Sequence, residues 1–172
     1  MINKLRNKNQ NKRGFTLLEV TLYIAILSTL VFGIGAFINL VSTVRVKSHV
    51  VSEVNQQALQ IIQTLTVDIR TANNITIPSI GQAGASLTLT DSSSNEVEFT
   101  LTDGVLSVDR GAGAVELSNS RVVLSDLEFK NLSRPSTPDM IHITFTLSYV
   151  NDINHESYDY SKTYVATALL SN

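Results

Sequence analysis

The feature that most constrains this chain is a run of twenty-five uncharged residues, from Val20 to Val44. A helix of that length reaches ~37 Å, which is enough to cross the ~30 Å hydrocarbon core of a bilayer. Five basic side chains and no acidic one occur in residues 1–14. Because Lys and Arg favour the cytoplasmic side of a membrane, we expect the N-terminus to stay in the cytoplasm and the C-terminal part to be exported.

Three interpretations of this segment compete. The first is a secretory signal peptide that is cleaved after a small residue such as Gly35 or Ala36. The second is an uncleaved signal anchor, in which Glu19 is tolerated because it lies near the membrane surface. The third is a cut between Gly14 and Phe15, which leaves the whole apolar helix on the mature protein. The length of the apolar run, which continues beyond Ala36, argues against the first interpretation.

The stretch "KRGFTLLEV" supports the third interpretation. It resembles the type III signal of type IV pilins and of type II secretion pseudopilins, in which glycine precedes the cut and glutamate is the fifth mature residue. Gly14, Phe15 and Glu19 match that pattern, and the three residues between Phe15 and Glu19 also agree with it. The resemblance implies that a prepilin peptidase cleaves between Gly14 and Phe15 and then methylates the new amine of Phe15.

The chemistry of these residues fits such processing. Glycine lets the chain lie extended in a protease cleft. Cleavage would create an amine with a typical pKa of ~7.7–8.0, which can carry a positive charge. A carboxylate at the bilayer centre costs about 2.5–3.5 kcal/mol, and a cationic partner lowers that cost. The resemblance implies that Glu19 pairs with the Phe15 amine of a neighbouring subunit, although the spacing of four residues also allows pairing within one chain.

The helical pattern continues beyond the membrane segment. Apolar residues recur at helical spacing after Val50, at Val51, Val54, Ala58, Ile61, Ile62, Leu65, Ile69 and Ala72. We expect one helix from about Phe15 to Ala72, with residues 15–44 in the membrane or filament core and 45–72 laid against a domain. Gly33 and Gly35 either weaken the helix on assembly or allow neighbouring helices to pack closely.

Residues 73–172 have a different pattern, of short alternating strands and polar turns. The dipeptide "DG" at 103–104 is a strong hairpin signal. The expected strands are 86–90, 96–102, 105–109, 114–118, 121–130, 140–150 and 160–170. A long helix followed by an antiparallel sheet predicts an α+β, pilin-like fold in which the second half of the helix covers the sheet.

The helix end "QQALQIIQTLTVDIRTANNI" resembles that of the J-type minor pseudopilins and the W-type minor pilins, through Asp68, Arg70 and Ala72. This resemblance implies a minor subunit, acting in a filament or in the complex that initiates its tip. The rival interpretation is a single-pass anchored binding domain that never polymerises.

Catalysis and metal binding find little support in the residues. The chain has no cysteine, and His49, His142 and His155 lack the spacing of metal ligands. Glu96 and Glu98 are typical of a solvated strand face, and "DSSSNE" lacks the alternating acids of a calcium loop. We therefore expect no enzyme activity, no metal and no cofactor. Residues 15–172 carry eight basic and fifteen acidic side chains, so no basic patch for nucleic acid is evident.

The resemblance also implies partners and a location. The expected partners are other pilins or pseudopilins, prepilin peptidase, the inner-membrane assembly platform and membrane lipid. The expected location is the cytoplasmic (inner) membrane as a single-pass protein, followed by a filament at the cell surface. Whether the machine secretes proteins, takes up DNA or builds a pilus is left open by the sequence.

Overall fold

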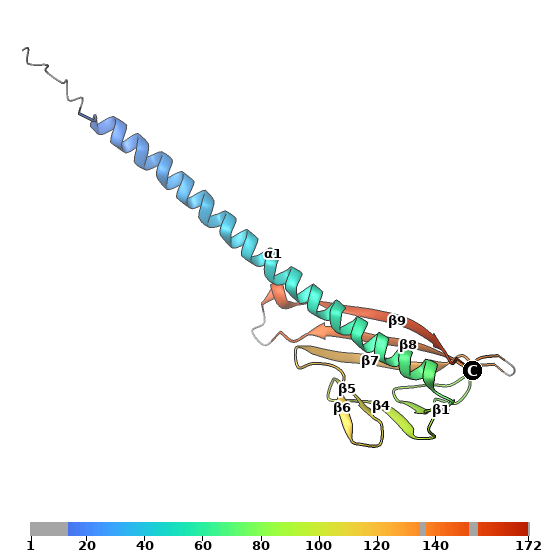
Figure 1. Cartoon of the computed structure of the whole chain (residues 1–172). Coiled ribbons are helices and arrows are strands. Elements are labelled where there is room, and N and C mark those ends of the chain that lie inside the picture. Colours follow the sequence, from blue (N-terminus) through green and yellow to red (C-terminus); the bar gives the residue numbers. More distant parts are fainter. Residues whose placement is uncertain (1–13, 135–136, 152–154, 172) are drawn as a thin grey trace, which may run out of the picture. The chain divides into compact units, whose positions relative to one another are not determined.

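The computed structural model describes residues 14–134, 137–151 and 155–171. The predicted leader therefore lies outside the described residues except for Gly14. The elements are α1 (Leu17–Thr71), β1 (Asn74–Ile77), β2 (Ala83–Gly84), β3 (Leu87–Thr90), β4 (Glu96–Thr102), β5 (Val105–Asp109), β6 (Ala114–Glu116), β7 (Val122–Asn131), β8 (Met140–Tyr149), the short 3-10 helix η1 (Glu156–Tyr158) and β9 (Ser161–Leu169). The predicted α+β fold is confirmed, with one long N-terminal helix and antiparallel sheets (Figure 1).

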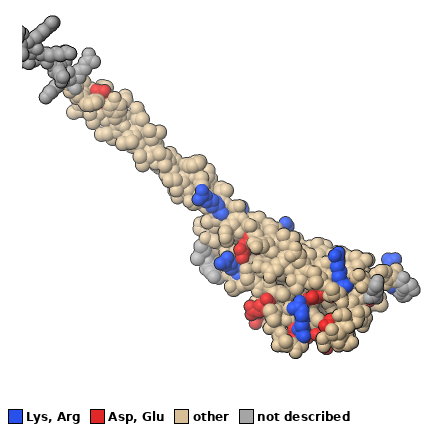
Figure 2. Space-filling view, viewed as in Figure 1, with Lys and Arg blue, Asp and Glu red and all other residues tan. Residues whose placement is uncertain are grey.

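Helix α1 begins and ends close to the predicted residues. The chain forms two compact units, and the boundary between them, after Ser42, falls within this helix. In the first unit the helix is long and apolar enough to cross a membrane, and its most apolar window has no buried residue. Figure 2 shows this part as uncharged apart from an acidic side chain near its start. The predicted limits of the membrane segment, 15–44, stay a prediction.

In the second unit, one face of α1 is buried. Its fully buried residues are spaced three or four apart, which places them on one side of the helix: Val50, Val54, Ala58, Ile61, Leu65 and Ile69. All of these except Val50 join the apolar side chains of both sheets in one core cluster. Leu59 and Val67 lie on the opposite side and are exposed.

The strands form two antiparallel sheets. One has the order β1-β3-β4-β5-β6, and the other has the order β2-β7-β8-β9. The predicted strands are confirmed, with ends that differ by a few residues. Strands β1 and β2 were not predicted from the sequence. β1 has only four residues and ends before a proline, and β2 consists of two small residues, so neither shows a clear alternating pattern.

The hairpin predicted at "DG" joins β4 to β5. Asp103 and Gly104 both have positive φ, at 50° and 79°, as a type I′ turn requires. A Cβ atom on Gly104 would lie 2.6 Å from Cγ1 of Val123 in β7. The backbone N–H of Leu124 also donates to the Gly104 carbonyl at 2.9 Å. Glycine here therefore lets the two sheets approach each other.

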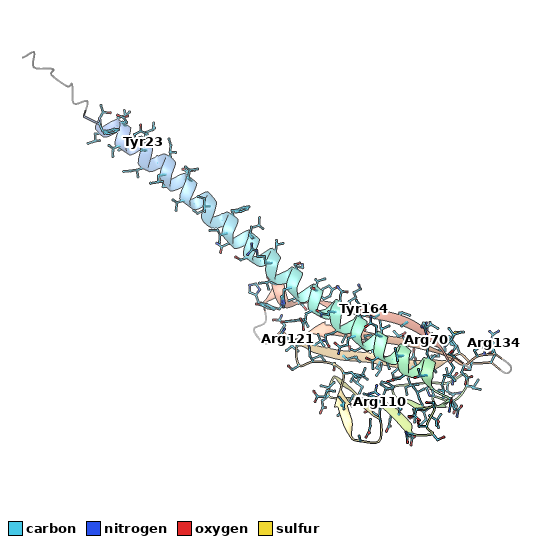
Figure 3. The ribbon with its side chains drawn as sticks, viewed as in Figure 1. Tyr23, Arg70, Arg110, Arg121, Arg134 and Tyr164 are labelled. Carbon is cyan, nitrogen blue, oxygen red and sulfur yellow. The ribbon has the colours of Figure 1, made fainter. Side chains whose placement is uncertain are left out.

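Polar side chains fix the helix against the sheets at three points. Glu53 accepts from Asn119 at 2.9 Å and pairs with Arg121 at 3.7 Å. Farther along α1, Asp68 pairs with Arg110, which follows β5. On the other side, Asn55 accepts a 2.8 Å hydrogen bond from the Tyr164 hydroxyl and a 3.3 Å bond from Lys162. Figure 3 shows Arg110, Arg121 and Tyr164 at their places around the sheets.

The buried face of α1 leads to a stability prediction. Leu65→Ala removes a side chain with 0% exposure and should lower the free energy of unfolding by about 2–5 kcal/mol, because it leaves a cavity. Leu59→Ala is the matched control on the same helix, since Leu59 is 60% exposed; its effect should stay within about 0.5 kcal/mol. Urea unfolding of the full chain in detergent micelles, followed by the circular dichroism of the sheets, measures both. Equal losses would contradict this packing.

The turn between β3 and β4 is organised by Asp91. Its Oδ1 atom accepts from the backbone N–H groups of Ser93 at 2.7 Å and Asn95 at 2.8 Å. The Asn95 backbone N–H lowers the pKa of the Asp91 carboxyl most. Desolvation, the next-largest effect, raises it, and the Asn95 side chain and the Ser93 N–H lower it further, so the net shift is downward. The "DSSSN" segment is therefore a turn, as predicted.

This lowered pKa gives a pH dependence. Because the folded state favours the charged carboxylate, the stabilisation is complete above the unfolded-state pKa of about 3.9 and is lost as the pH falls through the lower folded-state value. Asp91→Asn should therefore be less stable than the parent at neutral pH, and the two should converge in acid. Thermal unfolding from pH 7 down to pH 2 tests this. A constant difference across that range would rule out a role for the charge.

Candidate functional site at the start of the helix

The predicted cleavage position lies immediately before α1. Gly14, Phe15 and Thr16 belong to no helix or strand, and all three are exposed. A Cβ atom on Gly14 would have no atom within 4 Å apart from those of Gly14 and its chain neighbours. The fold of this chain therefore gives no steric reason for glycine at position 14, whereas an extended peptide in a protease cleft would.

Thr16 caps the helix. Its hydroxyl oxygen accepts from the backbone N–H of Glu19 at 3.2 Å, as in the first half of a capping box, the Thr-x-x-Glu pattern. Glu19 lies in the first turn of α1. A carboxylate there interacts favourably with the partial positive charge at the helix N-terminus.

The Glu19 side chain has a second partner within the chain. The Tyr23 hydroxyl, one turn farther along, donates to its Oε1 atom at 3.2 Å. Tyr23 also contacts Phe15 edge to face, with 6.4 Å between the ring centroids. Figure 3 labels Tyr23 near the start of the helix. The sequence analysis missed Tyr23, although its spacing of four residues from Glu19 was a usable signal.

The structure thus brings Phe15, Glu19 and Tyr23 together at one helix end. In the uncut chain the nitrogen of Phe15 is an uncharged amide. Cleavage before Phe15 would turn it into an amine at the positive end of the helix, on the chain that also carries the Glu19 carboxylate. The arrangement offers one fixed anionic group and one latent cationic group, which suits ion pairing rather than catalysis.

The other candidate residues are scattered. His49 is exposed on α1, His142 lies within 3.2 Å of the Thr167 hydroxyl, and His155 caps η1 by accepting from the Ser157 N–H. Glu96 and Glu98 are both exposed on one face of β4. Within the described residues, no group of three or more His, Cys, Asp or Glu side chains is arranged to hold a metal ion.

Comparison with known proteins gives one finding. Residues 9–35 match the family model described as the prokaryotic N-terminal methylation motif. Comparison with curated proteins and with solved structures gave no match. The matched segment contains Gly14, Phe15, Glu19 and Tyr23 and extends into the apolar helix. The motif, the apolar helix and the antiparallel sheets together support a type IV pilin-like protein that is made as a prepilin and anchored by a single membrane pass.

Proposed function

We propose that the chain is a minor pilin or pseudopilin, a structural subunit that joins a type IV pilus-like filament or a type II secretion pseudopilus, in or near its initiating tip complex. The observation that carries this proposal is the helix start, where an exposed glycine, a capped helix and one carboxylate precede a long uncharged run. The methylation motif supports the prepilin class. The likeness of the helix end, including Asp68 and Arg70, to J-type minor pseudopilins and W-type minor pilins supports the minor role.

The first step is processing. Prepilin peptidase cleaves the peptide bond between Gly14 and Phe15 on the cytoplasmic side and methylates the new amine. The exposure of Gly14 and Phe15 and the open space at the Cβ position of Gly14 support access to this bond. The methylated amine keeps its positive charge. The mature protein then begins with the helix that anchors it in the inner membrane.

The second step is pairing. When the subunit leaves the lipid for the filament, its Glu19 carboxylate pairs with the Phe15 amine of a neighbouring subunit. An unpaired carboxylate in apolar surroundings costs several kcal/mol. A subunit that joins at the wrong axial position leaves its Glu19 without a cation, so that position is disfavoured. Among the described residues, the Tyr23 hydroxyl bonds to Oε1 of Glu19, and Oε2 can accept an N–H of that amine.

In this role the second unit faces outward from the membrane and then from the filament. It presents its sheets to other pilins or pseudopilins, and the inner-membrane assembly platform acts on the membrane helix. The chain's work is mechanical and not catalytic.

Substitutions at Glu19 and Tyr23 test the pairing. Glu19→Ala should leave cleavage intact and reduce incorporation into sheared filaments about tenfold or more, because a charge-assisted hydrogen bond contributes ~1.5–3 kcal/mol. Quantitative immunoblots of the sheared and membrane fractions measure the effect.

Tyr23→Phe is the matched control. It removes the intrachain hydrogen bond of Glu19 but keeps the carboxylate, so incorporation should stay near the parent level. Normal filaments from Glu19→Ala would rule out the pairing. Equal losses from both variants would instead assign Glu19 to a local role with Tyr23. A cleaved parent chain that is absent from every filament would support the anchored domain that does not polymerise.

A further inference from the structure

A groove of about 380 Å³ lies within the second unit, where α1 enters it. One wall is a single turn of α1 and the other comes from the end of β8 and from η1. The lining residues are Arg45, Val46, His49, Val50, Tyr149 and Tyr158. Neither the methylation motif nor the pairing at Glu19 uses this groove.

The aromatic wall of the groove is fixed by its own contacts. The rings of Tyr149 and Tyr158 stack with 6.0 Å between their centroids, and His155 packs edge to face on Tyr158 at 6.2 Å. On the other side, Val50 is 1% exposed and anchors the helix turn in the core. The groove is therefore a formed surface in the free chain.

No acidic side chain that the structure describes forms an ion pair with Arg45 at the groove. Within the described residues, the ion pairs of the second unit use Arg110 and Arg121, and neither Arg45 nor Lys47 takes part in one. The acidic residues of η1 and its cap do not line the groove. The positive charge of Arg45 is thus available to an anion.

The distance of these residues from the membrane segment indicates which kind of anion lies near them. About twenty helical residues span the hydrocarbon core, and the headgroup layers add ~5–7 Å on each side. Counting from the start of the uncharged run at Val20, the hydrocarbon ends near Asn39, and the Arg45 backbone follows ~9 Å farther along the helix, ~2–4 Å beyond the headgroup layer, a gap that the long Arg45 side chain can span. Tyrosine rings and basic side chains are the residues that collect at this depth.

We infer that the groove binds the phosphate of an anionic phospholipid headgroup, with the Arg45 guanidinium donating to the phosphate oxygens and Tyr149 and Tyr158 lying against the headgroup. Lys47 adds positive charge on the same stretch of helix. The inference rests on the membrane anchoring in the proposed function. It adds that lipid holds the base of the second unit at the outer leaflet until assembly. Free phosphate offers the same chemistry but lacks the attachment to the bilayer, so the lipid is the occupant that we propose.

The absence of tryptophan from the chain allows a direct test. Tyr158→Trp places one fluorescent reporter in the groove of the full chain. The protein is reconstituted in vesicles of phosphatidylcholine and phosphatidylglycerol at equal amounts, in which either one lipid or the other carries a nitroxide at the headgroup end of an acyl chain. The nitroxide quenches tryptophan that lies within about 10–15 Å. Stronger quenching by labelled phosphatidylglycerol reports an anionic lipid at the groove.

The expected result is a preference for phosphatidylglycerol that falls about fivefold in Arg45→Gln, since one cation near an anionic surface contributes about 1 kcal/mol. Arg134→Gln is the matched control: it removes the same charge from a site away from the groove (Figure 3). Inorganic phosphate added in solution should leave the quenching unchanged. Equal quenching by both lipids, an equal loss in Arg134→Gln, or competition by inorganic phosphate would overturn the inference.

Two further measurements separate the possible failures. Flotation with the vesicles reports the anchor itself, so a chain that floats without a lipid preference refutes the groove but keeps the proposed function, whereas a chain that does not float refutes both. Native mass spectrometry of the parent chain from nanodiscs, with Tyr158 intact, detects retained phosphatidylglycerol independently of the reporter. Retention in the parent and loss in Arg45→Gln supports the inference, and no retention in the parent contradicts it.

Discussion

The structure depends on one helix that is built for two different surroundings. In its first half the apolar side chains point in all directions, which suits hydrocarbon and the packing of neighbouring helices. In its second half, the buried residues keep to a single face, from Val50 to Ile69, and the exposed side carries polar groups such as Gln56 and Gln60. The change in pattern occurs around Arg45 and Lys47. The fold of the second unit therefore follows from burial on one side of the helix, and the anchor follows from the absence of such burial.

The polar contacts of the second unit set how the helix is turned about its own axis. The bonds of Glu53, Asn55 and Asp68 to the sheets fix which side of α1 faces the core. Individually such partly exposed contacts contribute only about 0.2–1 kcal/mol, so their value lies in orientation more than in stability. At the start of the helix, Glu19 donates its backbone N–H to the capping hydroxyl of Thr16, and its carboxylate accepts from the Tyr23 hydroxyl.

Local patterns in the sequence predicted local structure well. The helix bounds, the hairpin at Asp103–Gly104 and the Asp91 turn all depend on residues within a few positions of each other. The division into two sheets could not be predicted, because it depends on pairings such as β2 with β7, which are distant in sequence. The bond from Tyr164 to Asn55 and the groove lined by Arg45 and Tyr158 could not be predicted for the same reason, because they join residues that are distant in sequence. Tyr23 differs from these, because its contact with Glu19 is local and follows from their spacing.

The central claim is that cleavage before Phe15 creates the cation that the Glu19 carboxylate needs. The most direct measurement is mass spectrometry of the N-terminal peptide of the protein purified from membranes of its native host. The account predicts a peptide that begins at Phe15 and carries one methyl group on its amine. A peptide that begins at Met1, or near Phe37 after a signal-peptidase cut, would contradict it.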